Sequence, residues 1–270
     1  MEEEEAPRLI VILEADGTTA ERAWNRPQNQ DRRLPASESV VGISSRESTP
    51  DGPKQHGSQI QLTFDDKPKN LEKGFVFGGD PQVCDVFLGE RGAGFSGQHF
   101  RIAFNERGQV IFENTSRKIA RVSYNGEYAP RRNQFTWILF DTYKNIKITV
   151  GEDDLIFKVK WPKNKTYQAE YEAHRDAYLG ERRNALPSLS QLGMESQQTT
   201  AVLTAQHSPR QQPIYLMEEE LGCGGFGTVH KAVDVSTGYE YAAKKFHTGT
   251  WEKEVEILKS ISHVSLIADL

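Results

Sequence analysis

The sequence predicts a mainly β chain, an antiparallel β-sandwich followed by a helix, a disordered linker and a small strand-rich unit. Short apolar runs with period-two alternation fill the stretch between residues 58 and 161. Turn formers such as Asn125-Gly126 separate the runs, and no helical period lies between them. This pattern is typical of an antiparallel sandwich. The runs are QIQLTF (59–64), GFVFG (74–78), CDVFL (84–88), HFRIAF (99–104), QVIFEN (109–114), ARVSYNG (120–126), FTWILF (135–140), NIKITV (145–150) and LIFKVKW (155–161).

Four segments divide the 270 residues. Residues 1–57 are acidic and polar, and we predict that they are mostly disordered, with RLIVIL as a candidate for an added strand. Residues 58–162 form the sandwich. Residues 163–213 comprise a helix, expected at 165–186, and a flexible linker of polar composition. Residues 214–270 alternate again and end in a helical pattern.

Charge and cysteine content exclude several classes of protein. The net charge is -5 and the pI is about 5.9, which argues against nucleic-acid and membrane-surface binding. The acidic run Glu2 to Glu5 has the wrong sign for a signal peptide, and the apolar run Leu9 to Leu13 is too short to cross a bilayer. Cys84 and Cys223 make no metal-binding spacing. We therefore expect an intracellular protein of the nucleus or cytoplasm, with no nucleic-acid or membrane partner.

A glycine-rich motif lies in the last segment. Gly222, Gly224, Gly227 and Val229 form G-x-G-x-x-G-x-V between two strand-like runs. Glycines let a backbone turn sharply and bring its N–H groups against phosphate oxygens, although a plain hairpin turn has the same composition. Lys244 follows Gly222 by 22 residues, in the run YAAK. The pair of signals at this spacing is more specific than either signal alone.

This motif resembles the amino-terminal lobe of a serine/threonine protein kinase, and the resemblance implies ATP with Mg²⁺ as the cofactor. It implies that Val229 and Ala242 pack on the adenine, that Phe226 lies at the loop tip and that Lys244 holds phosphate. Glu254 shares a helical face with Ile257, Leu258 and Ile261 and would pair with the lysine, the alternative being a surface acid. The predicted nucleotide site is Gly222, Gly224, Phe226, Gly227, Val229, Ala242, Lys244 and Glu254.

The groups that perform phosphoryl transfer in such kinases are not found in this sequence. No D-F-G occurs, and the H-R-D tripeptide at His174-Arg175-Asp176 precedes the glycine loop and carries Glu181 where an asparagine is required. We therefore predict a partial lobe that ends after helix αC, with no catalytic residue and no metal site. Residues 214–270 alone are expected not to bind ATP tightly, because half of their core would be uncovered.

A second set of motifs lies within the predicted sandwich. In order these are Phe77-Gly78-Gly79, Cys84-Asp85-Val86, Ser96-Gly97-Gln98-His99 and Tyr124-Asn125-Gly126. They resemble the forkhead-associated (FHA) domain, a β-sandwich that binds phosphothreonine peptides with its loops, over residues 58–161. The resemblance implies that Ser96 hydrogen-bonds the phosphate and that His99 braces the loop, a structural role.

Two departures from that pattern concern the phosphate. Gly79 stands where the family has an arginine, and the stretch Ser116 to Ala120 has no asparagine to hold the peptide backbone. Loop cations nearby could supply the charge instead, unless they are merely solvated. The predicted phosphopeptide site is Gly78, Ser96, His99, Arg117, Lys118 and Arg121.

The whole chain resembles fungal FHA-containing serine/threonine kinases related to checkpoint kinases. Its predicted function is binding of a phosphorylated protein or peptide by the sandwich, joined to an incomplete kinase domain. One alternative is an ATP-dependent serine/threonine kinase whose remaining lobe is missing from this sequence. Another is an adaptor that binds proteins without phosphate, which Gly79 favours.

Overall fold

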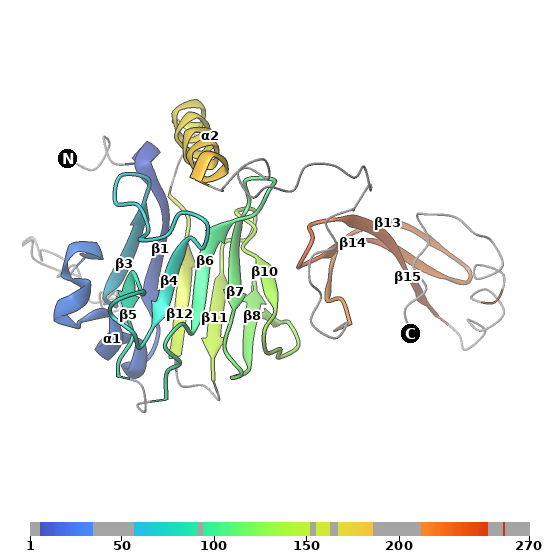
Figure 1. Cartoon of the computed structure of the whole chain (residues 1–270). Coiled ribbons are helices and arrows are strands. Elements are labelled where there is room, and N and C mark those ends of the chain that lie inside the picture. The colour runs from blue at the N-terminus through green and yellow to red at the C-terminus, as the bar shows by residue number, and fades with distance from the viewer. Residues whose placement is uncertain are drawn as a thin grey trace, which may run out of the picture. The chain divides into compact units, whose positions relative to one another are not determined.

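The computed structural model describes residues 6–34, 57–90, 94–151, 155–162, 167–185, 212–247 and 256. Two compact units divide the chain, Met1–Ser208 and Pro209–Leu270 (Figure 1). The prediction of a mainly β chain is confirmed. In the first unit the strands are β1 (Leu9–Ala15), β2 (Arg33–Leu34), β3 (Gln59–Thr63), β4 (Phe75–Gly78), β5 (Val86–Phe87), β6 (Phe100–Phe104), β7 (Val110–Asn114), β8 (Ala120–Tyr124), β9 (Glu127–Tyr128), β10 (Thr136–Ile138), β11 (Ile146–Val150) and β12 (Leu155–Lys160).

Two sheets make up the first unit. One has the order β2-β3-β1-β12-β11-β8-β9 and the other β10-β7-β6-β4-β5, with antiparallel neighbours except for the parallel pair β4 and β5. Each of the nine apolar runs contains a strand. The β8–β9 hairpin turns at Asn125 and Gly126, whose φ values of 51° and 94° suit an asparagine–glycine pair. The alternation and the turn residues therefore account for the strands of the sandwich.

The expectation that residues 1–57 are mostly disordered is wrong for residues 6–34. This stretch forms η1 (Ala6–Arg8), β1, α1 (Thr18–Trp24), η2 (Pro27–Arg32) and β2. Strand β1, which contains RLIVIL, pairs with β3 on one side and with β12 on the other. Nearly every residue of β1 is buried, because a strand inside a sheet is covered on both edges and packs on the opposite sheet. Residues 35–56 lie outside the described residues.

Aromatic rings fill the space between the two sheets. Phe100 of β6 stacks on Phe77 of β4 at 4.6 Å and on Phe157 of β12 at 5.7 Å between ring centroids. Trp24 at the end of α1 is fully buried, lies 5.6 Å from Phe157, and donates its indole N–H to the carbonyl of Leu13 at 3.0 Å. The short helix α1 is therefore anchored in the core that the two sheets share.

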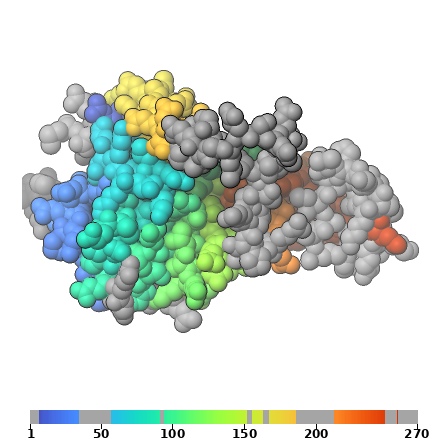
Figure 2. All heavy atoms as spheres, in the orientation of Figure 1, coloured from blue at the N-terminus to red at the C-terminus, as the bar shows by residue number. Residues whose placement is uncertain are grey.

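Helix α2 (Gln168–Ala185) confirms the helix predicted after the sandwich. Tyr171 and Tyr178 pack on Phe64, at 5.5 and 6.1 Å between ring centroids. Figure 1 shows α2 and α1 at opposite ends of the sandwich, and Figure 2 shows the blue amino-terminal residues against the cyan ones. The predicted linker after α2 lies outside the described residues up to position 211.

The second unit is a three-stranded antiparallel sheet in the order β13-β14-β15. Among its described residues the buried apolar side chains are few, namely Ile214, Leu216, Ala232, Val233 and Val235, and Asp234 is buried beside them in the sequence. The strands are β13 (Tyr215–Gly224), β14 (Gly227–Asp234) and β15 (Glu240–Phe246). Among the helices that the structure describes, in either unit, none has the length and apolar character needed to span a membrane.

Because β1 lies between β3 and β12, we expect a fragment of residues 58–161 not to fold. Without β1, the neighbouring strands β3 and β12 would have unpaired edges and the aromatic core would be uncovered. A fragment of residues 6–185, which retains β1 and α2, is the control. Urea unfolding followed by tryptophan fluorescence measures both, and a cooperative transition of the shorter fragment at the same midpoint would contradict the expectation.

Candidate functional site

The loop that contains Ser96 is fixed against the end of β4. A Cβ atom on Gly78 would lie 2.1 Å from the carbonyl oxygen of Gly97, so glycine is required where the two backbones meet. The N–H of Gly79 donates to the carbonyl of Ser96 at 2.9 Å, and Cys84 Sγ donates to the carbonyl of Gly97 at 2.9 Å. Gly78 therefore contributes a close backbone approach, and Gly79 a hydrogen bond that holds the loop.

His99 is buried at the base of this loop, with 1% of its surface exposed. Its Nδ1 accepts the backbone N–H of Ser96 at 2.9 Å. Burial, and to a smaller extent the charge of Lys118, lower the pKa of His99 to about 4. The ring is therefore neutral near pH 7 and carries its proton on Nε2. The hydrogen bond to Ser96 is compatible with a bracing role of His99, which stays a prediction.

A side-chain turn after β7 positions the predicted cations. Asn114 is fully buried, and its Oδ1 accepts the N–H and the hydroxyl of Ser116 at 3.1 and 2.9 Å. Its Nδ2 donates to the carbonyl of Lys118 at 2.7 Å. Lys118 reaches across to the preceding loop, where its Nζ lies 3.3 Å from the position of a Cβ atom on Gly94. Sequence reasoning missed Asn114, although an Asn-x-Ser stretch after a strand is a turn signal.

The three predicted cations do not converge. Lys118 points toward the loop at Gly94, whereas the preceding residue, Arg117, is exposed and does not line the cavity. Arg121 lies on β8, with its guanidinium over the ring of Tyr128 at 4.2 Å. Of the three, Lys118 alone lines the cavity beside His99. The structure thus brings Lys118 and His99 together with the Ser96 loop and leaves Arg117 and Arg121 outside that cavity.

The cavity beside His99 has a volume of about 240 Å³. One wall is formed by α1 and by Arg26 in the turn after it, and the other by the loop at Gly94 and Phe95 together with Lys118. Sequence reasoning missed the first wall, which carries Arg22 and Arg26. The lining residues are Thr19, Arg22, Ala23, Arg26, Leu88, Gly94, Phe95, His99, Lys118 and Val150.

The sequence contains a weak signal for the helix α1, which forms this wall of the cavity. Ala20, Ala23 and Trp24 are the buried residues of α1, and their i, i+3, i+4 spacing is that of one helical face. The helix has only seven residues, so the pattern is too short to stand out in a polar segment. The neighbouring side of the segment carries Thr19, Arg22 and Arg26, which line the cavity together with Ala23.

In the second unit the glycine motif closes the β13–β14 hairpin. Gly224 pairs with Gly227, and Gly225 and Phe226 form the tip, where Phe226 is 72% exposed. Gly222 pairs with Val229, which in turn pairs with Lys244 of β15. Directly opposite residues of antiparallel strands share one face of a sheet. One glycine, Val229 and Lys244 therefore form a row across three strands.

The face of that row is open. A Cβ atom at Gly222 or Gly224 would meet nothing within 4 Å, so packing inside the protein does not require glycine there. Ala242 and Lys244 are exposed, and Lys244 Nζ lies 5.0 Å from the ring centroid of Phe246. These backbones can accommodate a phosphate chain at close approach, as an ATP site needs.

Other predicted parts of a kinase site are not brought to this face. Glu254 lies outside the described residues. Within the part of the chain that the structure describes, no group of three or more acidic, histidine or cysteine residues is placed to hold a metal ion. The tripeptide His174-Arg175-Asp176 belongs to α2, where the ring of His174 stacks on Phe64 at 5.9 Å. Its environment is that of a packed helix face.

Comparison with known proteins gives a weak homology. No family model matches the chain. The chain is 24% identical to the serine/threonine-protein kinase RAD53 of Saccharomyces cerevisiae over 207 residues, which are 74% of this chain and 24% of that protein. A solved structure, the crystal structure of Rad53 1-466 in complex with AMP-PNP, aligns with 94% of this chain and 49% of the other, with 18% identity and a TM-score of 0.38. The chain spans about a quarter of the length of that kinase.

Because burial holds the pKa of His99 near 4, we expect its ring to stay neutral at pH 5.5, about one unit below the pKa of 6.5 of a free histidine. Between pH 6.5 and 4 the unfolded chain then binds a proton that the folded chain does not. The free energy of unfolding therefore falls as the pH falls through this window, by at most about 1.4 kcal/mol per pH unit.

A titration of the histidine ring resonances by NMR measures the midpoint. Urea unfolding of wild type and His99→Gln at pH 7 and pH 5 measures the linked stability, and the variant is expected to lose this part of the pH dependence. A His99 midpoint above pH 6 would contradict the expectation.

Proposed function

We propose that the sandwich is a phosphopeptide-binding module of the FHA type, which docks a phosphorylated protein or peptide at the end where the Ser96 loop and Lys118 lie. The observation that carries this proposal is the cavity of about 240 Å³ beside His99. It lies between the loop expected to bind phosphate and the turn held by Asn114. Its lining includes the cation Lys118, and cations recognise phosphate groups in peptides.

The weak homology to a yeast serine/threonine kinase supports the same assignment, because it covers about three quarters of the chain. The neutral His99 also supports it. A histidine that accepts the Ser96 N–H holds the loop in one conformation at any pH near neutrality. A loop that is ordered before binding loses less conformational entropy when the ligand arrives.

The test uses the full chain, because β1 is part of the sandwich. Immobilised degenerate phosphothreonine and matched threonine peptide libraries select a ligand, whose affinity is then measured by isothermal titration calorimetry. We expect the phosphopeptide to bind at least about tenfold more tightly than its unphosphorylated form, the equivalent of one charge-assisted hydrogen bond. Ser96→Ala should weaken binding of the phosphopeptide. Ser236→Ala, in the other unit, is the matched control and should leave this binding unchanged.

Equal binding of both peptides, or no binding, would count against the proposal. Binding that ignores phosphate and survives Ser96→Ala would instead favour the adaptor that binds proteins without phosphate.

A second candidate function is ATP-dependent phosphorylation of serine or threonine, favoured by the row of Gly222, Val229 and Lys244. In this reading, Val229 and Ala242 pack on the adenine, the glycine backbone approaches the phosphates and Lys244 neutralises their charge. ATP with Mg²⁺ would supply the phosphoryl group to be transferred. Reading the transcript beyond codon 270 for an in-frame H-R-D and D-F-G tests it, and their absence would remove this candidate.

A further inference from the structure

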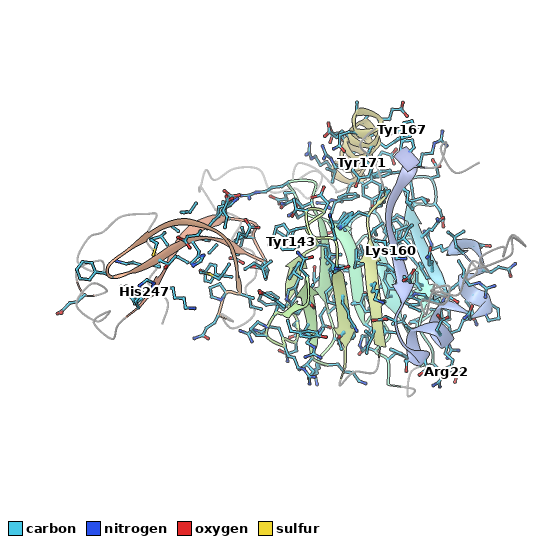
Figure 3. All side chains as sticks on the ribbon, turned by 180° about the vertical axis from the view of Figure 1, so that it is seen from behind. Arg22, Tyr143, Lys160, Tyr167, Tyr171 and His247 are labelled. Carbon is cyan, nitrogen blue, oxygen red and sulfur yellow. The ribbon has the colours of Figure 1, made fainter. Side chains whose placement is uncertain are left out.

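Two arginines of the α1 segment line the same cavity as Lys118. Arg22 lies on α1, and Arg26 lies in the turn between α1 and η2. Figure 3 shows Arg22 at the end of the sandwich opposite Tyr167 and Tyr171. Positive charge therefore enters the cavity from a segment that precedes β3 in the sequence, as well as from the turn after β7.

No carboxylate is found among the described residues that line this cavity. The nearest acid along α1, Glu21, is turned to the other side, where it accepts the N–H of Ser58 at 2.9 Å and the amide of Asn25 at 3.2 Å. Arg22 makes no hydrogen bond or ion pair with a described residue. Arg22, Arg26 and Lys118 bring positive charge to one small cavity, which favours a bound anion.

The guanidinium of Arg26 is held in place before any ligand arrives. Its Nε donates to the carbonyl of Leu88 at 3.1 Å, and its carbon lies 5.3 Å from the ring centroid of Phe87. A terminal nitrogen lies 3.0 Å from the position of a Cβ atom on Gly89. The helix itself is fixed by the buried Trp24, and the following turn by Asn29, whose Nδ2 donates to the Phe87 carbonyl at 2.9 Å. Such a preorganised fork suits a phosphate.

The volume of the cavity limits the size of the ligand that it can bind. Its volume of about 240 Å³ is below the ~300–1,000 Å³ typical of sites for drug-sized ligands. A single phosphorylated side chain is of suitable size, whereas the rest of a peptide would lie outside. Ala23, Leu88 and Val150 contribute apolar side chains to the lining.

We propose that Arg22 and Arg26 of the α1 segment, together with Lys118, hold the phosphate of a phosphorylated side chain in the cavity between α1 and the Gly94–Phe95 loop. This inference rests on the proposed phosphopeptide binding and names the residues that carry it. It makes a segment outside residues 58–161 part of the binding site. The phosphate then bridges two elements that are far apart in the sequence.

The experiment compares Arg22→Gln, Arg26→Gln and the double variant with wild type in the full chain, using the selected phosphopeptide and its unphosphorylated form. Each single variant should bind the phosphopeptide about tenfold more weakly, since it loses one charge-assisted hydrogen bond. Binding of the unphosphorylated peptide should not change. Lys144→Gln, which removes a cation at the opposite end of β11, is the matched control.

A second measurement, which needs no peptide, is an NMR titration with inorganic phosphate. Saturable shifts of the Thr19, Phe95 and Lys118 amides are expected for wild type and not for the double variant. The amide spectra also verify that the variants are folded, and Arg22→Gln is the safer one because its side chain contacts no described partner.

Phosphopeptide binding that all arginine variants retain would overturn this inference and leave the proposed function intact. If wild type does not distinguish the peptides, the proposed function fails. The phosphate titration then decides whether the arginines form an anion site, and the absence of saturable shifts would overturn the inference.

Discussion

The burial of Trp24 between the two sheets is the constraint on which the candidate site depends. The indole ring lies against Phe77 of one sheet and Phe157 of the other, and its N–H is satisfied by the Leu13 carbonyl. A buried aromatic ring of this size is costly to displace, so α1 cannot turn or slide without opening the core. Because Trp24 anchors α1 in the core, the α1 wall of the cavity beside His99 is fixed.

The strands of the sandwich could be predicted because their causes are local. Alternation sets the face of each side chain, and pairs such as Asn125-Gly126 close the hairpins. Residues 6–34 could not be predicted in the same way, because their order comes from partners distant in sequence. Strand β1 is ordered by β3 and β12, and Asn29 is ordered by the edge of β5. Polar composition alone says nothing about such partners.

The candidate site likewise contains residues that could be predicted from the sequence and residues that could not. His99 and Lys118 were predicted from motifs, and the structure places both at one cavity. Arg121 follows the same turn in sequence, but the alternation of β8 directs it to Tyr128 instead. Arg22 and Arg26 carry no motif, and the packing of α1 and of the turn after it positions them. Gly79 has no side chain and its N–H holds the Ser96 loop, so the positive charge at this cavity comes from the α1 segment and from Lys118 in the turn after β7.

The phosphate sites proposed in the two units would depend on different physics. In the sandwich, charged side chains surround a small cavity, so affinity would come from Coulomb attraction and would weaken as salt screens the three cations. In the glycine hairpin, Lys244 lies beside an open glycine backbone, so affinity would depend on close approach of the ligand to the backbone. A monoester held on a side chain suits the first arrangement, and an extended phosphate chain suits the second.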